Sequence, residues 1–273
     1  MATAVSTRLR PIRSGVIAMP RGYAFRGEAR SRRELLGIGL DETNAISCPF
    51  GAFLVDHPVE GPVLVDTGID KNLGLVMGMF FRGLKLNPDE TVPAQLRAWD
   101  VRPEEIRTVV MTHLHADHTS GMGALPNATF VTTREEWRDA TARGSVGRGY
   151  VRAHLPAESS VRFVDFAGGE AFEGLERTID LLGDGTIRLV STPGHTPGHL
   201  SVLVATESGL VFIVGDAVYT LRNLREDILP LRTASDEDSR RSMAQLRAYA
   251  DAHPDVPLVP THDADAWDRL AAE

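Results

Sequence analysis

The chain has 273 residues, of which 42% are hydrophobic and 24% are charged, and this composition is that of an ordinary globular protein. The formal net charge is −8 and no dense basic run is present, which argues against nucleic acid as the main partner. We find neither a signal peptide nor an apolar segment long enough to span a membrane. Cys48 is the only cysteine, so no internal disulfide can form, and we expect a reducing, cytoplasmic location.

The first third of the chain is predicted to be rich in short strands. Glycine and proline residues separate apolar runs, which predicts strands at Ser14–Met19, Gly51–Asp56 and Pro62–Asp66. Residues 77–81 are rich in Met and Phe, which suits a groove for an acyl chain or a dimer contact, and a plain core role is the alternative. A homodimer is therefore compatible with the sequence but is not required by it.

Helices and strands alternate in the rest of the chain. The spacing of apolar residues predicts helices at Val92–Trp99, Thr119–Leu125, Arg134–Ala142 and Asp236–Ala252, and a short helical turn from Pro103. Ser235 is expected to cap the last helix. Strands are predicted at Thr108–Thr112, Ala128–Thr132, Val161–Asp165, Thr178–Leu182, Thr186–Ser191, Leu200–Ala205, Leu210–Val214 and Val256–Val259. The Gly-rich stretch Arg143–Ser160 is predicted to be a loop.

This order of elements predicts an α/β fold. Two rounds of strands followed by a helix suggest two mixed sheets packed face to face, with helices on their outer faces. No internal repeat and no Pro- or Ser-rich linker divides the sequence. We therefore predict a single domain over residues 1–273.

The six residues from 113 to 118 carry four side chains that can ligate a metal: His113, His115, Asp117 and His118. Imidazole and carboxylate together suit zinc, iron, cobalt or manganese. Side chains two residues apart in an extended segment point the same way, so His113 and His115 can bind one cation. Asp117 and His118 follow where the chain turns, which favours a second, adjacent cation. A structural alternative is a capped helix start with surface histidines.

Three further candidates follow predicted strands or lie in tight turns: His195, Asp216 and His262. Polar side chains just beyond apolar strands can converge on one rim of a sandwich. We predict that His195 completes a first site with His113 and His115. His262 would complete a second site with Asp117 and His118. Asp216 is the best candidate to bridge the two cations, because a carboxylate has two oxygens.

Other polar residues near these motifs have more than one interpretation. Asp66 can orient a ligand histidine or simply form an Asx turn. His199 is interpreted as a structural hydrogen-bonding residue close to the turn of His195. We assign His57, His154 and His253 to the surface.

The pattern His-x-His-x-Asp-His, followed by His195, Asp216 and His262, resembles the metallo-β-lactamase superfamily. The resemblance extends from Leu54-Val55-Asp56 and Leu64-Val65-Asp66-Thr67-Gly68 to His262-Asp263. Within the superfamily the chain looks most like the N-acyl-homoserine lactone lactonases, in which a tyrosine three residues after the bridging aspartate contacts the substrate carbonyl. Tyr219 is at that position. Class B β-lactamases match less well, since they usually have cysteine or serine at the position of Asp216.

The resemblance implies an αβ/βα sandwich, two divalent metal ions with zinc as the first choice, and a lactone substrate. It implies that a metal-held hydroxide attacks the lactone carbonyl, that Tyr219 stabilises the oxyanion, and that Asp117 passes a proton to the leaving alkoxide. Two features depart from close lactonase relatives. Thr261 precedes His262 where glycine is expected, and residues 143–160 cannot be matched to these relatives.

Other functions fit parts of the same pattern. A thioesterase, a different lactonase or a phosphotriesterase would share the ligand set, although the short acidic end, Asp263–Glu273, argues against a glutathione thioesterase. An iron-dependent dioxygenase of the persulfide type would use two histidines and one carboxylate on a single ion. A non-catalytic protein that keeps metal for structure is a further alternative.

Overall fold

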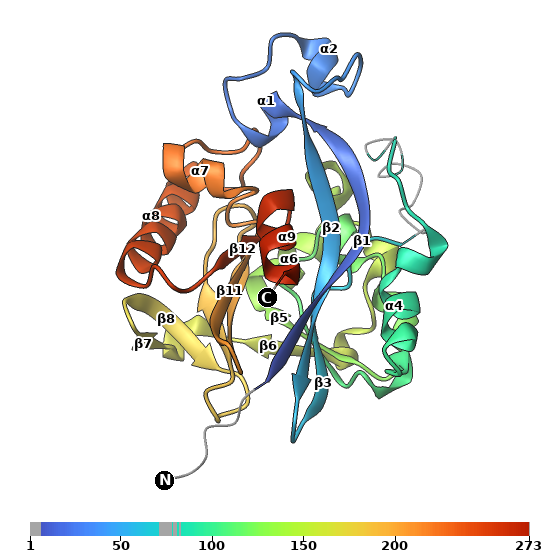
Figure 1. The fold of residues 1–273 in the computed structure, drawn as a ribbon, viewed down its shortest axis with the longest axis vertical. Coiled ribbons are helices and arrows are strands. Elements are labelled where there is room, and N and C mark those ends of the chain that lie inside the picture. Colours follow the sequence, from blue (N-terminus) through green and yellow to red (C-terminus); the bar gives the residue numbers. More distant parts are fainter. Residues whose placement is uncertain (1–6, 71–77, 79–80, 82, 273) are drawn as a thin grey trace.

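Two six-stranded sheets pack face to face in the computed structural model, which describes residues 7–70, 78, 81 and 83–272 (Figure 1). The first sheet has the order β1 (Arg8–Pro20), β2 (Ala45–His57), β3 (Gly61–Val65), β4 (Thr108–Val110), β5 (Thr129–Thr133) and β6 (Val161–Val164). The second has the order β12 (Leu258–Pro260), β11 (Gly209–Gly215), β10 (Leu200–Thr206), β9 (Ile187–Ser191), β8 (Leu175–Asp180) and β7 (Glu170–Phe172). The predicted pair of packed sheets is confirmed.

Both sheets are mixed. In the first sheet β1 is antiparallel to β2 and β2 is antiparallel to β3, whereas β3, β4, β5 and β6 run parallel to one another. In the second sheet β7 to β11 are antiparallel and β11 is parallel to β12. The strand β7 and the full lengths of β1 and β2 exceed the sequence prediction. Long strands with an irregular register, such as β1 with its shift against β2 at residues 13–15, do not keep one simple alternation.

Alternating side chains fill the space between the sheets. Val63 and Val65 of β3 point into the core shared by both sheets, while Leu64 points to the outer face. Val202 and Val204 of β10 enter the same shared core from the second sheet, and Leu203 faces outward. Successive side chains point to opposite faces of a sheet, and here both sets are apolar. Each sheet therefore has a second apolar face, which helices cover.

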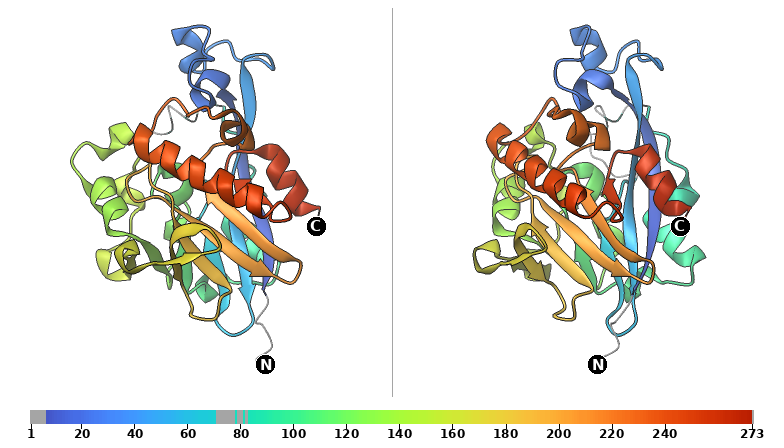
Figure 2. Two further views of the ribbon diagram at one scale, coloured as in Figure 1. Left: turned by 90° about the vertical axis from the view of Figure 1, so that its left-hand side faces the viewer. Right: turned by 60° about the vertical axis from the view of Figure 1, so that its left-hand side comes forward.

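Helices cover the outer faces on opposite sides of the molecule (Figures 1 and 2). Helices α4 (Val92–Ala98) and α6 (Arg134–Thr141) pack on the first sheet, and α7 (Leu221–Glu226) and α8 (Asp236–Ala252) pack on the second. The bounds and the Ser235 cap of α8 agree with the prediction, because Ser235 Oγ accepts the Asp238 N–H. Helix α9 (Ala264–Ala271), which was not predicted, instead packs Trp267 into the core between the sheets.

The remaining described elements are short. Helices α1 (Arg21–Ala24) and α2 (Arg32–Leu35) lie together at one end of the molecule (Figure 1). The stretch 143–160, predicted as a loop, contains 3-10 turns at Ser145–Arg148, Arg152–His154 and Glu158–Ser160; other 3-10 turns lie at Pro88–Glu90, Pro103–Glu105, Met122–Ala124 and Phe166–Gly168. Among the described helices, none combines the length and the apolar character needed to span a bilayer.

The Met- and Phe-rich run 77–81 lies mostly outside the described residues. Phe81, which is described, packs edge-on against Phe50 at 5.4 Å between ring centroids. Phe50 in turn packs edge-on against His262, also at 5.4 Å. Phe81 is therefore two side-chain contacts away from a candidate ligand.

Candidate metal centre

All seven predicted ligand side chains meet at one edge of the sandwich. His113 to His118 follow β4, His195 follows β9, Asp216 follows β11 and His262 follows β12. Strands β11 and β12 are parallel, and β9 runs the same way because both β9 and β11 are antiparallel to β10. Their carboxyl ends therefore open at the same edge, which is where α/β sheets usually present functional side chains.

A short helix divides the first motif into two parts. Helix α5 (Ala116–Thr119) begins directly after His115, whose carbonyl accepts the N–H groups of His118 and Thr119. Asp117 and His118 thus lie in a helical turn and project differently from His113 and His115. The predicted helix Thr119–Leu125 is wrong, since α5 ends at Thr119. The backbone of Gly121 packs closely on Thr67, because an added Cβ would be 2.4 Å from the Thr67 carbonyl oxygen.

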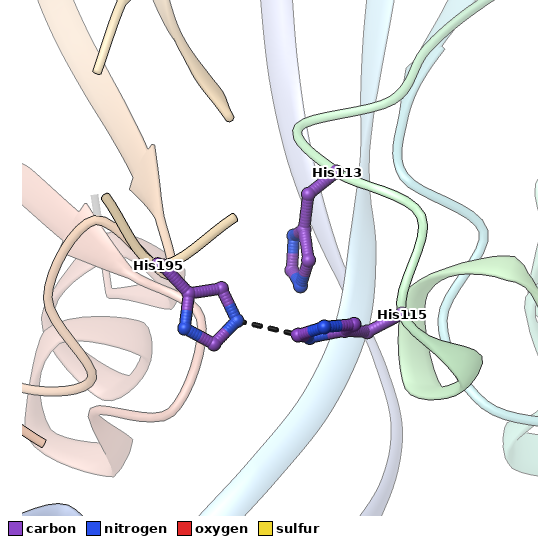
Figure 3. A group of neighbouring side chains, drawn as sticks. All are labelled: His113, His115 and His195. Atoms are coloured by element: carbon purple, nitrogen blue, oxygen red, sulfur yellow. Dashed lines mark hydrogen bonds between the residues drawn. The ribbon is translucent and has the colours of Figure 1, made fainter. Parts of the chain in front are cut away.

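The first group consists of His113, His115 and His195, whose rings point toward one another (Figure 3). His195 Nε2 lies 3.0 Å from His115 Nδ1. His113 packs edge-on against both partners, with ring centroids 4.6 Å from His115 and 4.8 Å from His195. Three imidazole nitrogens therefore face a common point.

The second group consists of Asp117, His118 and His262. Asp117 Oδ2 lies 3.7 Å from His118 Nε2 and 3.6 Å from His262 Nε2. The Asp117 side chain is 12% exposed, whereas those of the two histidines are almost fully buried. This group is thus closed by histidines on one side and reaches solvent through its carboxylate.

Asp216 lies between the two groups. Its Oδ2 is 3.5 Å from His195 Nε2 and 3.0 Å from His262 Nε2, and its Oδ1 is 3.5 Å from His118 Nε2. Two ligand atoms on a tetrahedral zinc ion at about 2.0–2.1 Å are about 3.3 Å apart. The ligand-atom separations in both groups bracket this value, so the donor set fits two divalent cations that share one carboxylate.

Four buried polar atoms of the centre have no hydrogen-bond partner within the described part of the chain. They are His113 Nε2, His118 Nε2, His195 Nδ1 and Asp216 Oδ1. Such atoms are costly unless something else satisfies them. Burial lowers the pKa of His113 and His195 well below its usual value, and that of His115 to about 4. These imidazoles are neutral at pH 7, as metal ligation requires.

The carboxylates change the charge balance in the second group. Burial alone would lower the pKa of His118, but the charges of Asp66 and Asp216 outweigh burial and raise it well above its usual value. Asp216 does the same for His262. In turn, although burial opposes it, His262 and His118 hold the pKa of Asp216 well below its usual range. Without a cation, protons on these histidines compensate the buried carboxylate.

Hydrogen bonds on the far side of the rings orient the ligands. His118 Nδ1 donates to Asp66 Oδ2 at 2.8 Å, and His262 Nδ1 donates to the Pro49 carbonyl at 3.0 Å. Each bond turns the other ring nitrogen, Nε2, toward the centre. Asp66 also accepts the N–H and the hydroxyl of Thr112. Of its two interpretations, the structure therefore supports the one in which Asp66 orients a histidine.

Replacing Asp66 by asparagine tests this orienting role. Asn tolerates the left-handed backbone of this position (φ 60°) and keeps an oxygen for Thr112, but it loses the charge beside His118. We expect zinc affinity to fall about 10- to 100-fold at one of the two sites, as for other partners of ligand histidines. Competition with a chromogenic chelator measures it. Asp56→Asn, at a half-buried pair with Arg10 outside the predicted ligand set, is the control, and equal affinity in both variants would contradict the role.

His199 acts as the predicted hydrogen-bonding residue. Its Nδ1 donates to Thr192 Oγ1 at 2.9 Å, and its Nε2 accepts the Asp216 N–H at 3.0 Å. The approach is close: a Cβ on Gly215, which has φ 57°, would lie 2.8 Å from His199 Nε2. Gly215 is therefore needed for both its backbone angle and its lack of a side chain. The departure at Thr261 leaves this region intact, since the Thr261 N–H donates to the Gly215 carbonyl.

Tyr219 lies across the centre. Its ring packs edge-on against His195 and His262, at 5.4 and 5.2 Å between centroids. Burial raises the pKa of its hydroxyl well above the usual value, so the group is protonated and can donate a hydrogen bond. Tyr23 of α1 stacks on Tyr219 at 6.4 Å, a neighbour that the sequence analysis did not identify.

Two histidines assigned to the surface are in fact buried. His57 is 4% exposed, and its Nε2 bonds Asp184 Oδ2 at 2.8 Å across the turn between β8 and β9. His154 is 8% exposed, and its Nδ1 lies 3.0 Å from Thr119 Oγ1. Partners distant in sequence bury both rings, which no local pattern reveals. His253 is partly exposed and stacks on Tyr249.

The geometry defines a class of site: a buried centre of five histidines and two aspartates with a shape suited to two divalent cations, of the kind that metal-dependent hydrolases use. Residues 52–262 match the family described as the metallo-beta-lactamase superfamily. The chain belongs to this superfamily.

Several relatives carry a more specific name. The chain is 34% identical over 232 residues to the N-acyl homoserine lactonase AttM of Agrobacterium fabrum, covering 81% of this chain and 84% of that protein. It is 29% identical over 229 residues to an N-acyl homoserine lactonase of Bacillus cereus, with the same coverage.

Solved structures share the fold. A variant of AiiA from B. thuringiensis with N-decanoyl-L-homoserine in its active site has a TM-score of 0.76 at 22% identity, covering 98% of this chain and 97% of that one. AidC, a dizinc quorum-quenching lactonase with bound product, has a TM-score of 0.66 at 15% identity, covering 96% and 90%. The predicted sandwich with helices on its outer faces agrees with this fold.

Proposed function

We propose that this protein is a metal-dependent hydrolase that opens the ring of N-acyl homoserine lactones. The observation that carries the proposal is the pair of ligand groups joined by Asp216, with the Tyr219 ring lying against His195 and His262. The names of the most similar curated relatives support the same substrate. The seven residues His113, His115, Asp117, His118, His195, Asp216 and His262 would hold two divalent ions, and we propose zinc; iron, cobalt and manganese accept the same donors.

When bound, the two ions would lower the pKa of a water molecule toward about 7 and polarise the lactone carbonyl. The chain's own residues complete the site. Tyr219 is protonated and donates its hydroxyl to the oxygen that becomes negative as the carbonyl is attacked. Asp117 can pass a proton to the ring oxygen as it leaves, because its carboxylate is more exposed than that of Asp216. The product is a hydroxy acid.

The direct test is hydrolysis of a lactone by zinc-loaded protein. N-hexanoyl and N-decanoyl homoserine lactones are followed by proton release, beside a thioester, a phosphotriester and a β-lactam. We expect the homoserine lactones to have the highest kcat/KM. A protein that binds two zinc ions but leaves these lactones intact would refute the proposal, and preference for another ester would reassign the substrate.

Replacing Tyr219 by phenylalanine isolates the hydroxyl. We expect kcat/KM for the lactone to fall roughly 10²- to 10³-fold, the cost of one lost donor to an oxyanion. Zinc content should stay unchanged, because the hydroxyl is not among the ligands. Tyr249→Phe is the matched control, since Tyr249 is a buried residue of α8 that packs on the outer face of the second sheet. Activity of Tyr219→Phe within a few-fold of the parent would remove the residue from this role.

Location and assembly remain predictions. Cys48 is a buried free thiol, in keeping with the cytoplasmic location expected from the sequence. We also propose that the chain forms one domain, since residues of both sheets and of α9 contribute to one core. A homodimer can be checked by light scattering at several protein concentrations.

A further inference from the structure

Glu136 is a buried carboxylate that lies outside the predicted ligand set. It lies in the first turn of α6, where Thr133 Oγ1 accepts its N–H at 3.1 Å. Its exposed fraction is 0%. An ionisable side chain in such a place is costly unless hydrogen bonds offset the burial, so its partners indicate what it does.

The partners of Glu136 belong to both loops that carry the first ligand group. Its Oε1 accepts the N–H of Leu114 at 2.9 Å, and Leu114 lies between His113 and His115. Its Oε2 accepts the N–H of Gly198 at 3.2 Å, three residues after His195. The two loops follow strands of different sheets. The Glu136 carboxylate therefore links a loop of the first sheet to a loop of the second sheet, and both loops supply ligands to the first metal site.

The third partner of Glu136 is Tyr150, whose ring packs on the ligand His115. The Tyr150 hydroxyl donates to Glu136 Oε1 at 3.1 Å, and the Tyr150 ring packs on His115 at 4.8 Å between centroids. Gly149 lies close to the same imidazole and leaves no room for a side chain, since a Cβ there would lie 2.9 Å from His115 Cδ2. Glu136 thus fixes the backbone beside His115 and, through Tyr150, its ring.

We propose that Glu136 is a positioning residue that sets the separation of His115 from His195 in the first metal site. The inference rests on the proposed metal centre, but not on its substrate. The two ligand nitrogens lie 3.0 Å apart, and neither loop bonds Glu136 through its ligand side chain. The carboxylate is suited to this task because it only accepts hydrogen bonds and all three of its partners donate.

Glu136→Gln is the sharpest variant, since it keeps the size of the side chain. The amide carries one oxygen and one NH₂, so it can accept a hydrogen bond from the N–H of one loop only. Its NH₂ group would then lie against the N–H of the other loop, and two donors cannot form a hydrogen bond. We expect the affinity of one zinc site to fall about 10- to 100-fold while the other is kept. Chelator competition and the absorption spectrum of the cobalt form, recorded without any lactone, measure this. Glu135→Gln, the exposed neighbour on α6, is the matched control.

Each result decides the inference. Two sites of parental affinity and an unchanged cobalt spectrum in Glu136→Gln would overturn it. If that variant does not fold, Tyr150→Phe replaces it, since both backbone links stay; we then expect a loss of roughly 3- to 10-fold at one site, and no loss overturns the inference. Because these readouts need no substrate, a parent protein that binds two zinc ions but opens no lactone refutes the proposed function alone.

Discussion

Replacing Asp216 by asparagine is expected to reduce kcat/KM for the lactone by about 10³-fold or more. The carboxylate lies within 3.5 Å of ligand nitrogens from both groups, so it is the residue through which two cations would share charge. Asparagine is neutral and presents an NH₂ toward nitrogens that should accept a cation. Metal ions contribute several kcal/mol to such reactions, and each 1.36 kcal/mol is tenfold in rate.

The metal content distinguishes this cause from a general loss of fold. We expect Asp216→Asn to bind fewer than two zinc ions per chain after dialysis, by atomic emission, while its far-ultraviolet circular dichroism matches the parent. Asp268→Asn, at an exposed pair with Arg13, should keep both ions and full activity. Two tightly bound ions and near-parental turnover in Asp216→Asn would exclude a bridging role.

Much of this centre could be predicted because its ligands follow strands. The run from His113 to His118 concentrates four donors in six residues, and each remaining ligand follows an apolar strand or a glycine turn. Strand ends are readable from local sequence, and parallel strands bring them to one edge. The family resemblance added Tyr219, which no periodicity would have singled out.

The residues that position the ligands could not be predicted from local sequence. Thr133-x-x-Glu136 is typical of a capping box, in which the glutamate reaches back to its own helix end. Instead, Glu136 bonds residues 22 and 62 positions away along the chain. His57 and His154 were misassigned for the same reason, since their partners are 127 and 35 residues distant. Local sequence predicts elements and their ends, whereas packing between sheets decides which polar residues are buried.

Removing the metal ions is expected to abolish lactone hydrolysis and to lower the melting temperature. Each ion that binds only the folded chain stabilises it by about 2.7 kcal/mol when free zinc is about 100 times the Kd of its site. Differential scanning fluorimetry of chelator-treated protein, before and after zinc is returned, measures both the loss and its recovery. Magnesium, which prefers oxygen ligands, should not restore stability and serves as the control.

The stripped protein should also become less stable as pH rises, and the sign follows from its histidines. His118 and His262 have folded-state pKa values raised above 6.5, so their contribution is present below pH 6.5 and is lost as pH rises through the raised values. His113, His115, His195 and His199 have lowered pKa values, so above about pH 7 they are neutral in the folded state and largely neutral in the unfolded state. Between about pH 7 and pH 8.5 the raised pair therefore outweighs the lowered histidines.

Zinc must displace those protons, so its binding should release protons and tighten as pH rises. The melting temperature of the zinc-loaded protein should therefore stay nearly level from pH 7 to pH 8.5 while that of the stripped protein falls, and the gap between them should widen. Calorimetric titration of zinc in two buffers with different ionisation enthalpies counts the protons released. A gap that narrows with pH, or zinc binding without proton release, would mean that Asp66 and Asp216 do not hold protonated histidines in the metal-free centre.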